Sequence, residues 1–125
     1  MVKKKILIVD DEMDARSVLE KSLASKGYSA ITARNGIDAI SLAKAECPDL
    51  IILDRVLGDM LGEEVAAKLK EDVKTKDIPI IFLSALFSKK EEIEKDHVFG
   101  DHVMFAKPYD TQELVNAIEE RILVE

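Results

Sequence analysis

Two adjacent aspartates, Asp10 and Asp11, follow directly after the apolar run ILIV near the start of the chain. The run has no polar alternation, which is typical of a strand buried on both faces of a sheet. Carboxylates crowded at the end of such a strand repel one another unless they are protonated or bridged by a cation. The pattern therefore indicates a cation site at the carboxyl end of this strand.

Three more polar residues end apolar runs further along the chain. Asp54 closes the run LIILD, Ser84 closes IIFLS, and Lys107 follows HVMFA. In parallel sheets flanked by helices, ligands bind outside the carboxyl ends of the strands. These three residues are therefore expected to converge with Asp10 and Asp11 on one rim of a sheet.

The residue types on this rim suit a hard cation and an oxyanion. Oxygen ligands without His or Cys select a hard ion, and a carboxylate site that keeps several waters suits Mg²⁺. A metal and Lys107 would neutralise a phosphoryl group, to which the Ser84 hydroxyl would donate a hydrogen bond. The sequence has no P-loop motif and no Ser-His or Cys-His pair to build on. A carboxylate can itself be the nucleophile, and Asp54 is the candidate for an aspartyl phosphate.

Five apolar strands alternate with five stretches of helical spacing. The strands are expected at 6–9, 28–33, 50–54, 80–84 and 102–106. The second helix should carry Ile37, Ile40 and Ala43 inward, and Ser88 with Glu91 forms a capping box for a fourth helix over 88–96. The alternation implies a parallel sheet with helices on both faces, built as a single domain over 1–125.

The composition excludes several classes of function. The net charge of -7 argues against a nucleic-acid surface, which needs concentrated Lys and Arg. Cys47 is the only cysteine, so no intrachain disulfide forms and a reducing compartment fits. No apolar run approaches the roughly 18 residues of a membrane span, and no signal peptide precedes the first strand. We therefore expect a cytoplasmic protein.

Four motifs occur in the order ILIVDDE, PDLIILD with Gly62 eight residues after Asp54, IIFLSA and FAKP. Together they resemble the receiver domain of two-component response regulators, including the chemotaxis type, over essentially the whole chain. The resemblance implies a flavodoxin-like, doubly wound α/β fold. Its five parallel strands would have the order 2-1-3-4-5, with five helices on both faces.

The resemblance also implies roles for the acids. Asp54 would be the phosphoacceptor, and Asp11, Asp54 and the backbone carbonyl of Val56 would bind Mg²⁺ directly. Asp10 would act mainly through a metal-bound water. The chain would accept a phosphoryl group from a histidine kinase or a phosphotransfer protein and then change its partners. Self-catalysed phosphoryl transfer and autodephosphorylation would be its only reactions.

For the remaining motif residues, the resemblance implies that Ser84 and Lys107 contact the phosphoryl oxygens. Pro108, directly after Lys107, matches a cis peptide bond that is usual in the family. Met104 occupies the position of the family's aromatic switch residue, which predicts looser coupling to the output surface. Phe105 should face the opposite side of its strand and belong to the core.

Two apolar residues, Val56 and Leu86, align with positions at the mouth of the family's site. Neither side chain can hydrogen-bond an attacking water, which predicts slow self-dephosphorylation. Leu57 and Gly58 replace the family's usual Met-Pro, which predicts a more flexible loop. Glu12 is interpreted as a first-turn acid that favours the helix dipole.

Two other function classes remain as alternatives. A degenerate receiver would bind partners without phosphorylation. An aspartate-nucleophile phosphatase similar to the haloacid dehalogenases would need a second Asp where Val56 stands. A flavin carrier would share the fold, but no hydroxyl-rich phosphate loop follows the first strand.

The expected output surface comprises the fourth helix (88–96), the fifth strand (102–106) and the last helix. It would bind a partner protein or domain, with neither nucleic acid nor membrane bound directly, and it allows a phosphorylation-dependent dimer. The chain ends with its last helix, which fits either a stand-alone receiver or a fragment of a longer regulator.

Overall fold

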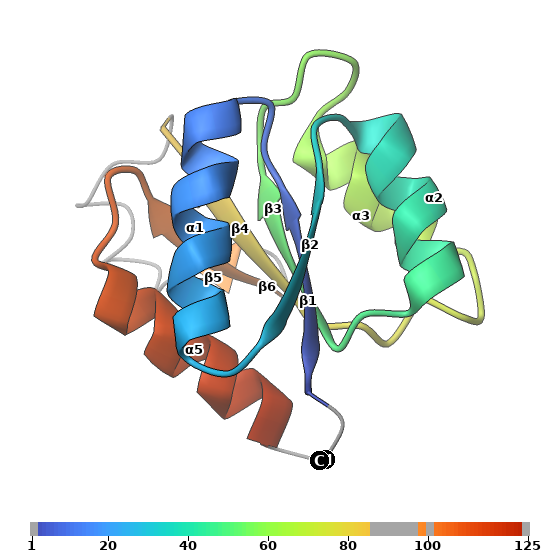
Figure 1. Ribbon diagram of the computed structural model, residues 1–125. Coiled ribbons are helices and arrows are strands. Elements are labelled where there is room, and N and C mark those ends of the chain that lie inside the picture. Colours follow the sequence, from blue (N-terminus) through green and yellow to red (C-terminus); the bar gives the residue numbers. More distant parts are fainter. Residues whose placement is uncertain (1–2, 86–97, 100–101, 124–125) are drawn as a thin grey trace.

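The computed structural model describes residues 3–85, 98–99 and 102–123. Within them the chain forms one sheet in the order β2-β1-β3-β4-β6-β5 (Figure 1). The strands are β1 (Lys5–Val9), β2 (Ser29–Ala33), β3 (Leu50–Asp54), β4 (Ile80–Ser84), β5 (Val98–Phe99) and β6 (His102–Ala106). All neighbours pair in parallel except β5, which pairs antiparallel with β6.

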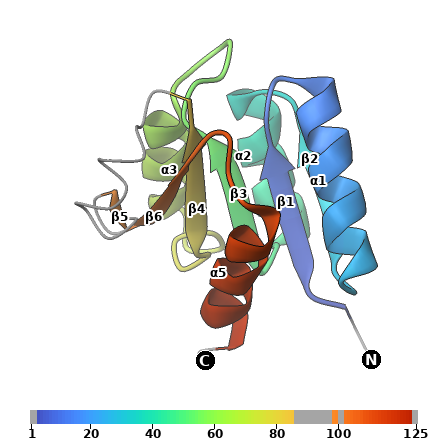
Figure 2. The same cartoon turned by 90° about the vertical axis from the view of Figure 1, so that its left-hand side faces the viewer.

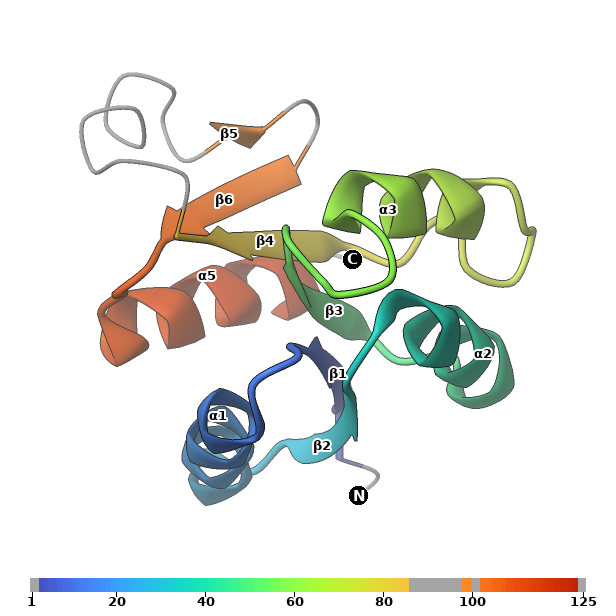
Figure 3. The same cartoon turned by 90° about the horizontal axis from the view of Figure 1, so that it is seen from above.

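Helices cover both faces of this sheet. They are α1 (Met13–Ser25), α2 (Gly36–Glu46), α3 (Gly62–Lys70) and α5 (Thr111–Leu123). Seen from above, α2 and α3 lie on one side of the strands, and α1 and α5 lie on the other (Figure 3). The molecule therefore has three layers, with a hydrophobic core on each side of the sheet.

Successive side chains of the central strands point to opposite faces of the sheet and so belong to the two cores in turn. In β1, Leu7 and Val9 pack on the side of α2 and α3, whereas Ile6 and Ile8 pack on the side of α1 and α5. Every residue of β3 and β4 is buried. Because both faces of these strands are covered, their apolar runs need no polar alternation. The carboxyl ends of the parallel strands all lie toward the top of Figure 2.

The predicted fold is confirmed in its parallel core. The five predicted strands are the five parallel ones, in the expected order, with β6 as the fifth. The sheet differs from the prediction by the added antiparallel strand β5, whose two residues are too few to show a periodicity. Four of the five predicted helices are observed, and the fourth, over 88–96, lies outside the described residues.

Several local predictions can be compared with the structure. The Lys107–Pro108 bond is cis, as expected, and Gly27, just after α1, has φ +93. The inward orientation of Ile37 was wrong, because this residue is 61% exposed. The buried face of α2 passes through Ala39 and Ala43, and Ile37 lies off that stripe in the first turn. No helix among the described residues is long and apolar enough to span a bilayer.

Candidate functional site at the carboxyl ends of the strands

The predicted rim residues lie at neighbouring strand ends. Asp54 is the last residue of β3 and Ser84 is the last residue of β4. Asp10 directly follows β1, and Lys107 directly follows β6. The backbone N–H of Lys107 donates to the carbonyl of Ser84 at 3.0 Å, which fixes the relative position of these two ends. The parallel register thus brings four of the predicted residues to one edge of the sheet.

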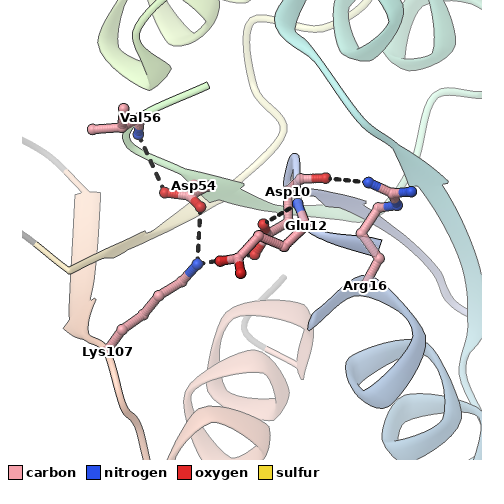
Figure 4. A network of polar contacts seen from close by, with 6 residues as sticks. All are labelled: Asp10, Glu12, Arg16, Asp54, Val56 and Lys107. Atoms are coloured by element: carbon pink, nitrogen blue, oxygen red, sulfur yellow. Dashed lines mark hydrogen bonds and ion pairs between the residues drawn. The ribbon is translucent and has the colours of Figure 1, made fainter. Parts of the chain in front are cut away.

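Lys107 bridges two buried carboxylates at the centre of the site (Figure 4). Its Nζ lies 3.0 Å from Oδ2 of Asp10 and 2.9 Å from Oδ2 of Asp54. Asp10 is 3% exposed and Asp54 is 7% exposed. The other oxygen of each carboxylate accepts a backbone N–H, from Glu12 at 2.9 Å and from Val56 at 3.2 Å respectively. Each of the four carboxylate oxygens therefore has a partner, which holds both carboxylates in fixed orientations.

Burial and charge shift the pKa values of this cluster in opposing ways. Burial raises the pKa of Asp54, and the hydrogen bond and charge of Lys107 offset only part of that rise. Burial by itself would lower the pKa of Lys107, but its hydrogen bonds to Asp54 and Asp10 raise it well above the ordinary value of 10.5. Lys107 is thus a permanent cation and serves as the counterion of both acids.

A second group of acids lies beside the bridge. Carboxylate oxygens of Asp10, Asp11 and Glu12 all lie within 4.8 Å of one another. Glu12 is the N-cap residue of α1, but its side chain makes no capping hydrogen bond. Glu12 was expected to act only on the helix dipole, and its adjacency to Asp11 is the one sequence signal for its place in this cluster. This all-oxygen donor set fits a hard cation such as Mg²⁺.

A pocket of about 280 Å³ opens onto these groups. Its lining residues are Asp11, Glu12, Asp54, Val56, Ala85 and Lys107. Asp10 and Ser84 are buried next to lining residues and are only 3% and 1% exposed. Val56 is 43% exposed, so its side chain borders the opening, as expected for a residue at the mouth of the site. Leu86, the other predicted mouth residue, lies outside the described residues.

The loop between β3 and α3 shapes one side of the pocket. The N–H of Gly62 donates to the carbonyl of Arg55 at 2.7 Å, and the N–H of Leu57 donates to the carbonyl of Met60 at 3.3 Å. A side chain at Gly62 would be impossible without movement, because its Cβ would lie 2.7 Å from the carbonyl oxygen of Asp54. Leu57 is buried. The greater flexibility expected of the Leu57–Gly58 stretch stays a prediction.

The two neighbouring residues on β6 point to opposite sides of the sheet, as expected. Met104 is fully buried in the core under α2 and α3. Phe105 is buried in the core under α1 and α5. Met104 thus occupies its strand position as part of the packed interior, and its influence on an output surface stays a prediction.

The fold and the rim together define a flavodoxin-like α/β protein with a lysine-bridged carboxylate site at the ends of its central strands. The family model of the response regulator receiver domain matches residues 6–119. The chain therefore belongs to the response regulator receiver domain family. Receivers of this family act as phosphorylation-dependent switches in two-component signalling, which confirms the predicted class of function.

Three similar proteins illustrate the relationship. The chain is 40% identical over 115 residues to the phosphate regulon transcriptional regulatory protein PhoB of Pseudomonas aeruginosa, covering 92% of this chain and 50% of that protein. It is 32% identical over 120 residues to the sporulation initiation phosphotransferase F of Bacillus subtilis, covering 96% and 94%. The crystal structure of the receiver domain of a Pseudomonas aeruginosa sensor histidine kinase has a magnesium ion in its active-site cleft. It superposes on this chain with a TM-score of 0.82 at 26% identity, covering 97% of this chain and 98% of that one.

The lengths of these relatives differ. The chain spans about half or less of several curated relatives that it matches, among them the probable transcriptional regulators ycf27 of Porphyridium aerugineum and Cyanophora paradoxa. It spans nearly all of the sporulation phosphotransferase. Receiver domains thus occur both within longer regulators and as proteins of this length.

Proposed function

We propose that Asp54 is the phosphoacceptor of this receiver. The observation that carries the proposal is the bridge from Lys107 to Asp54 and Asp10 at the floor of an open pocket. Asp54 presents a carboxylate that is buried, oriented and yet reachable from the pocket. A nucleophile held in one orientation beside a cation needs little reorganisation to attack an incoming phosphorus.

The transfer would proceed by attack of an Asp54 carboxylate oxygen on the phosphorus. An O–P bond forms, the bond from phosphorus to the donor breaks, and its electron pair leaves with the donor group. Lys107 would keep its ion pair with Asp10 and turn its other hydrogen bond to a phosphoryl oxygen. The hydroxyl of Ser84 would donate to a second phosphoryl oxygen.

Mg²⁺ is the cofactor that we propose for this step, because a bound Mg²⁺ would supply positive charge for the phosphoryl oxygens. Asp11, Asp54 and the backbone carbonyl of Val56 would hold it, and Asp10 would act through a water. Asp11, Asp54 and Val56 all line the same pocket, and the neighbouring carboxylates of Asp10, Asp11 and Glu12 form an all-oxygen cluster, which supports this assignment.

The phosphoryl donor would be a histidine kinase or a histidine phosphotransfer protein. Phosphorylation would change the binding of an output partner on the surface that includes β6 and α5; the predicted fourth helix over 88–96 lies outside the described residues. The domain would catalyse only its own phosphorylation and dephosphorylation, would bind neither nucleic acid nor membrane directly, and would work in the cytoplasm. A phosphorylation-dependent dimer is compatible with this role.

Labelling with acetyl phosphate and Mg²⁺ tests the phosphoacceptor. Intact-mass spectrometry should show one added phosphoryl group on the wild type and none on Asp54→Asn. Asp49→Asn is the matched control. Asp49 directly precedes β3, at the end of the strand far from Asp54, and its carboxylate accepts the N–H of Lys5 at 2.7 Å. Equal labelling of Asp54→Asn would refute the assignment. An unlabelled wild type would favour a receiver that works without phosphorylation.

Thermal unfolding tests the metal. Mg²⁺ that binds the native state raises the unfolding midpoint according to its concentration relative to Kd. The midpoint should rise in the wild type and in Asp14→Ala, whose acid lies exposed in the first turn of α1, but barely in Asp11→Ala. Equal rises in all three proteins would locate the metal elsewhere.

A further inference from the structure

The loop between β3 and α3 is hydrogen-bonded to α2, although α2 is not one of the elements that this loop joins. Oδ1 of Asp59 accepts the N–H of Gly36 at 2.9 Å, and Oδ2 accepts the N–H of Ile37 at 3.0 Å. Gly36 and Ile37 are the first two residues of α2. Figures 1 and 3 show this loop beside the start of α2. One carboxylate thus joins the loop that carries Val56 to the neighbouring helix.

The contact does more than cap a helix. The side chain of Asn35 already accepts the N–H of Asp38 at 2.8 Å, so α2 has a cap from its own N-cap residue. The N–H groups of Gly36 and Ile37, which donate to Asp59, also belong to the first turn of α2, where backbone donors have no partner within the helix. They hold the Asp59 carboxylate in its charged form, since the bond from Gly36 in particular lowers its pKa.

Packing next to Asp59 brings the loop and the helix into close contact. Gly36 leaves no room for a side chain, because a Cβ there would collide with the side chain of Met60. Met60 in turn packs against the buried core under α2 and α3. The hydrogen bonds of Asp59 and the contact of Met60 therefore hold the tip of the loop from two adjacent points.

We propose that Asp59 is a positioning residue for the metal and phosphoryl site. It fixes the tip of the loop against α2. The N–H of Leu57 donates to the carbonyl of Met60, and this hydrogen bond links the fixed tip to the residue next to Val56. The backbone of Val56, which lines the pocket and donates its N–H to Asp54, is thereby held in place. This inference rests on the proposed function, because Val56 serves there as a metal ligand.

Mg²⁺ titrations of three variants test the inference. Asp59→Ala removes both acceptors, whereas Asp59→Asn keeps one oxygen and one of the two bonds. Asp72→Ala is the control, because Asp72 also accepts a loop N–H, from Lys74 at 2.8 Å, but lies beyond the far end of α3. Binding is followed by the amide NMR shifts of Asp54 and Val56, and folding by the thermal midpoint without metal.

The Kd for Mg²⁺ should rise about 10-fold in Asp59→Ala, at the lower end of the effect of residues that orient metal ligands. It should rise less in Asp59→Asn and stay unchanged in Asp72→Ala. A role confined to stability would instead lower the midpoint of Asp59→Ala and leave its Kd at the wild-type value, and that result would overturn the inference.

Hydrogen exchange separates this inference from the proposed function. Exchange at Gly36, Ile37 and Leu57 should accelerate together in Asp59→Ala, which needs no metal. If the wild type fails to bind Mg²⁺, the proposed metal site is wrong, and the exchange data still test the fastening of the loop. If Leu57 exchanges as in the wild type while Gly36 and Ile37 accelerate, Asp59 acts on α2 alone and the inference fails.

Discussion

Replacing Lys107 by methionine should destabilise the fold in the absence of metal. The substitution keeps most of the apolar stem and removes the ammonium that lies 3.0 Å from Asp10 and 2.9 Å from Asp54. Both acids are more than nine-tenths buried, so neither gains a full hydration shell in exchange. Two like charges would then face each other without their shared counterion.

The size of the effect follows from the burial of the three groups. Breaking a buried ion pair by removing one partner costs about 3–5 kcal/mol. The side chain of Lys107 is 19% exposed and borders the pocket, so water reaches part of the cluster. We therefore expect a loss of about 3 kcal/mol, at the low end of that range. For a domain of this size the loss corresponds to a midpoint lower by about 10 °C.

Urea unfolding in EDTA measures this loss. Lys5→Met is the matched control, because Lys5 pairs with Glu46 at 2.8 Å on the surface, where an ion pair contributes about 0.2–1 kcal/mol. Mg²⁺ should reduce the deficit of Lys107→Met by supplying a cation to the same acids. The cost should also fall in an Asp54→Asn background, since one buried charge is then absent. Equal losses for Lys107→Met and Lys5→Met would refute the bridging role of Lys107.

Three further predictions follow from the same site. Gly62→Ala should destabilise the fold by about 1–3 kcal/mol in urea unfolding, because its Cβ would meet the backbone of Asp54. Gly58→Ala is the control and should change the stability by no more than about 0.5 kcal/mol, because the space around Gly58 is open. A neutral Gly62→Ala would contradict the close approach. The raised pKa of Lys107 means that its ion pairs stabilise the fold below pH 10.5 and lose this contribution as the pH rises beyond it. The wild type should therefore lose more stability than Lys107→Met from pH 10 to 12, roughly, and parallel curves would count against that shift. Val56→Asn should shorten the lifetime of the phosphorylated protein, measured by phosphate release, because an amide at the pocket mouth can orient water; an unchanged or longer lifetime would show that Val56 does not shield the phosphoryl group.

The sequence was sufficient to predict the strands and the convergence of the central site residues. Apolar runs without alternation identify strands covered on both faces, and parallel pairing then brings Asp10, Asp54, Ser84 and Lys107 to one edge whatever the details of packing. These predictions depend on residue type and order along the chain, and both are visible in the sequence.

The features that the sequence did not reveal depend on geometry between distant segments. The hydrogen bonds of Asp59 to Gly36 and Ile37 join residues from different loops, and no local pattern marks the acceptor. Glu12 joins the acid cluster through the turn after β1, which a helix-dipole argument does not describe. The exposure of Ile37 depends on the rotation of α2 about its axis, which is set by packing rather than by the presence of an apolar residue.

The close approach of Gly62 to Asp54 restricts the length of the loop between β3 and α3. The first residue of α3 rests against the backbone carbonyl of the last residue of β3, so the intervening loop must leave and return at nearly the same point. A residue inserted or deleted in this loop would move Gly62 away from Asp54 or push the backbone of α3 into β3. Surface loops usually tolerate such length changes well. Here length variation among natural or engineered variants should therefore be tolerated on the far side of α3, after Lys70, and be rare between Asp54 and Gly62.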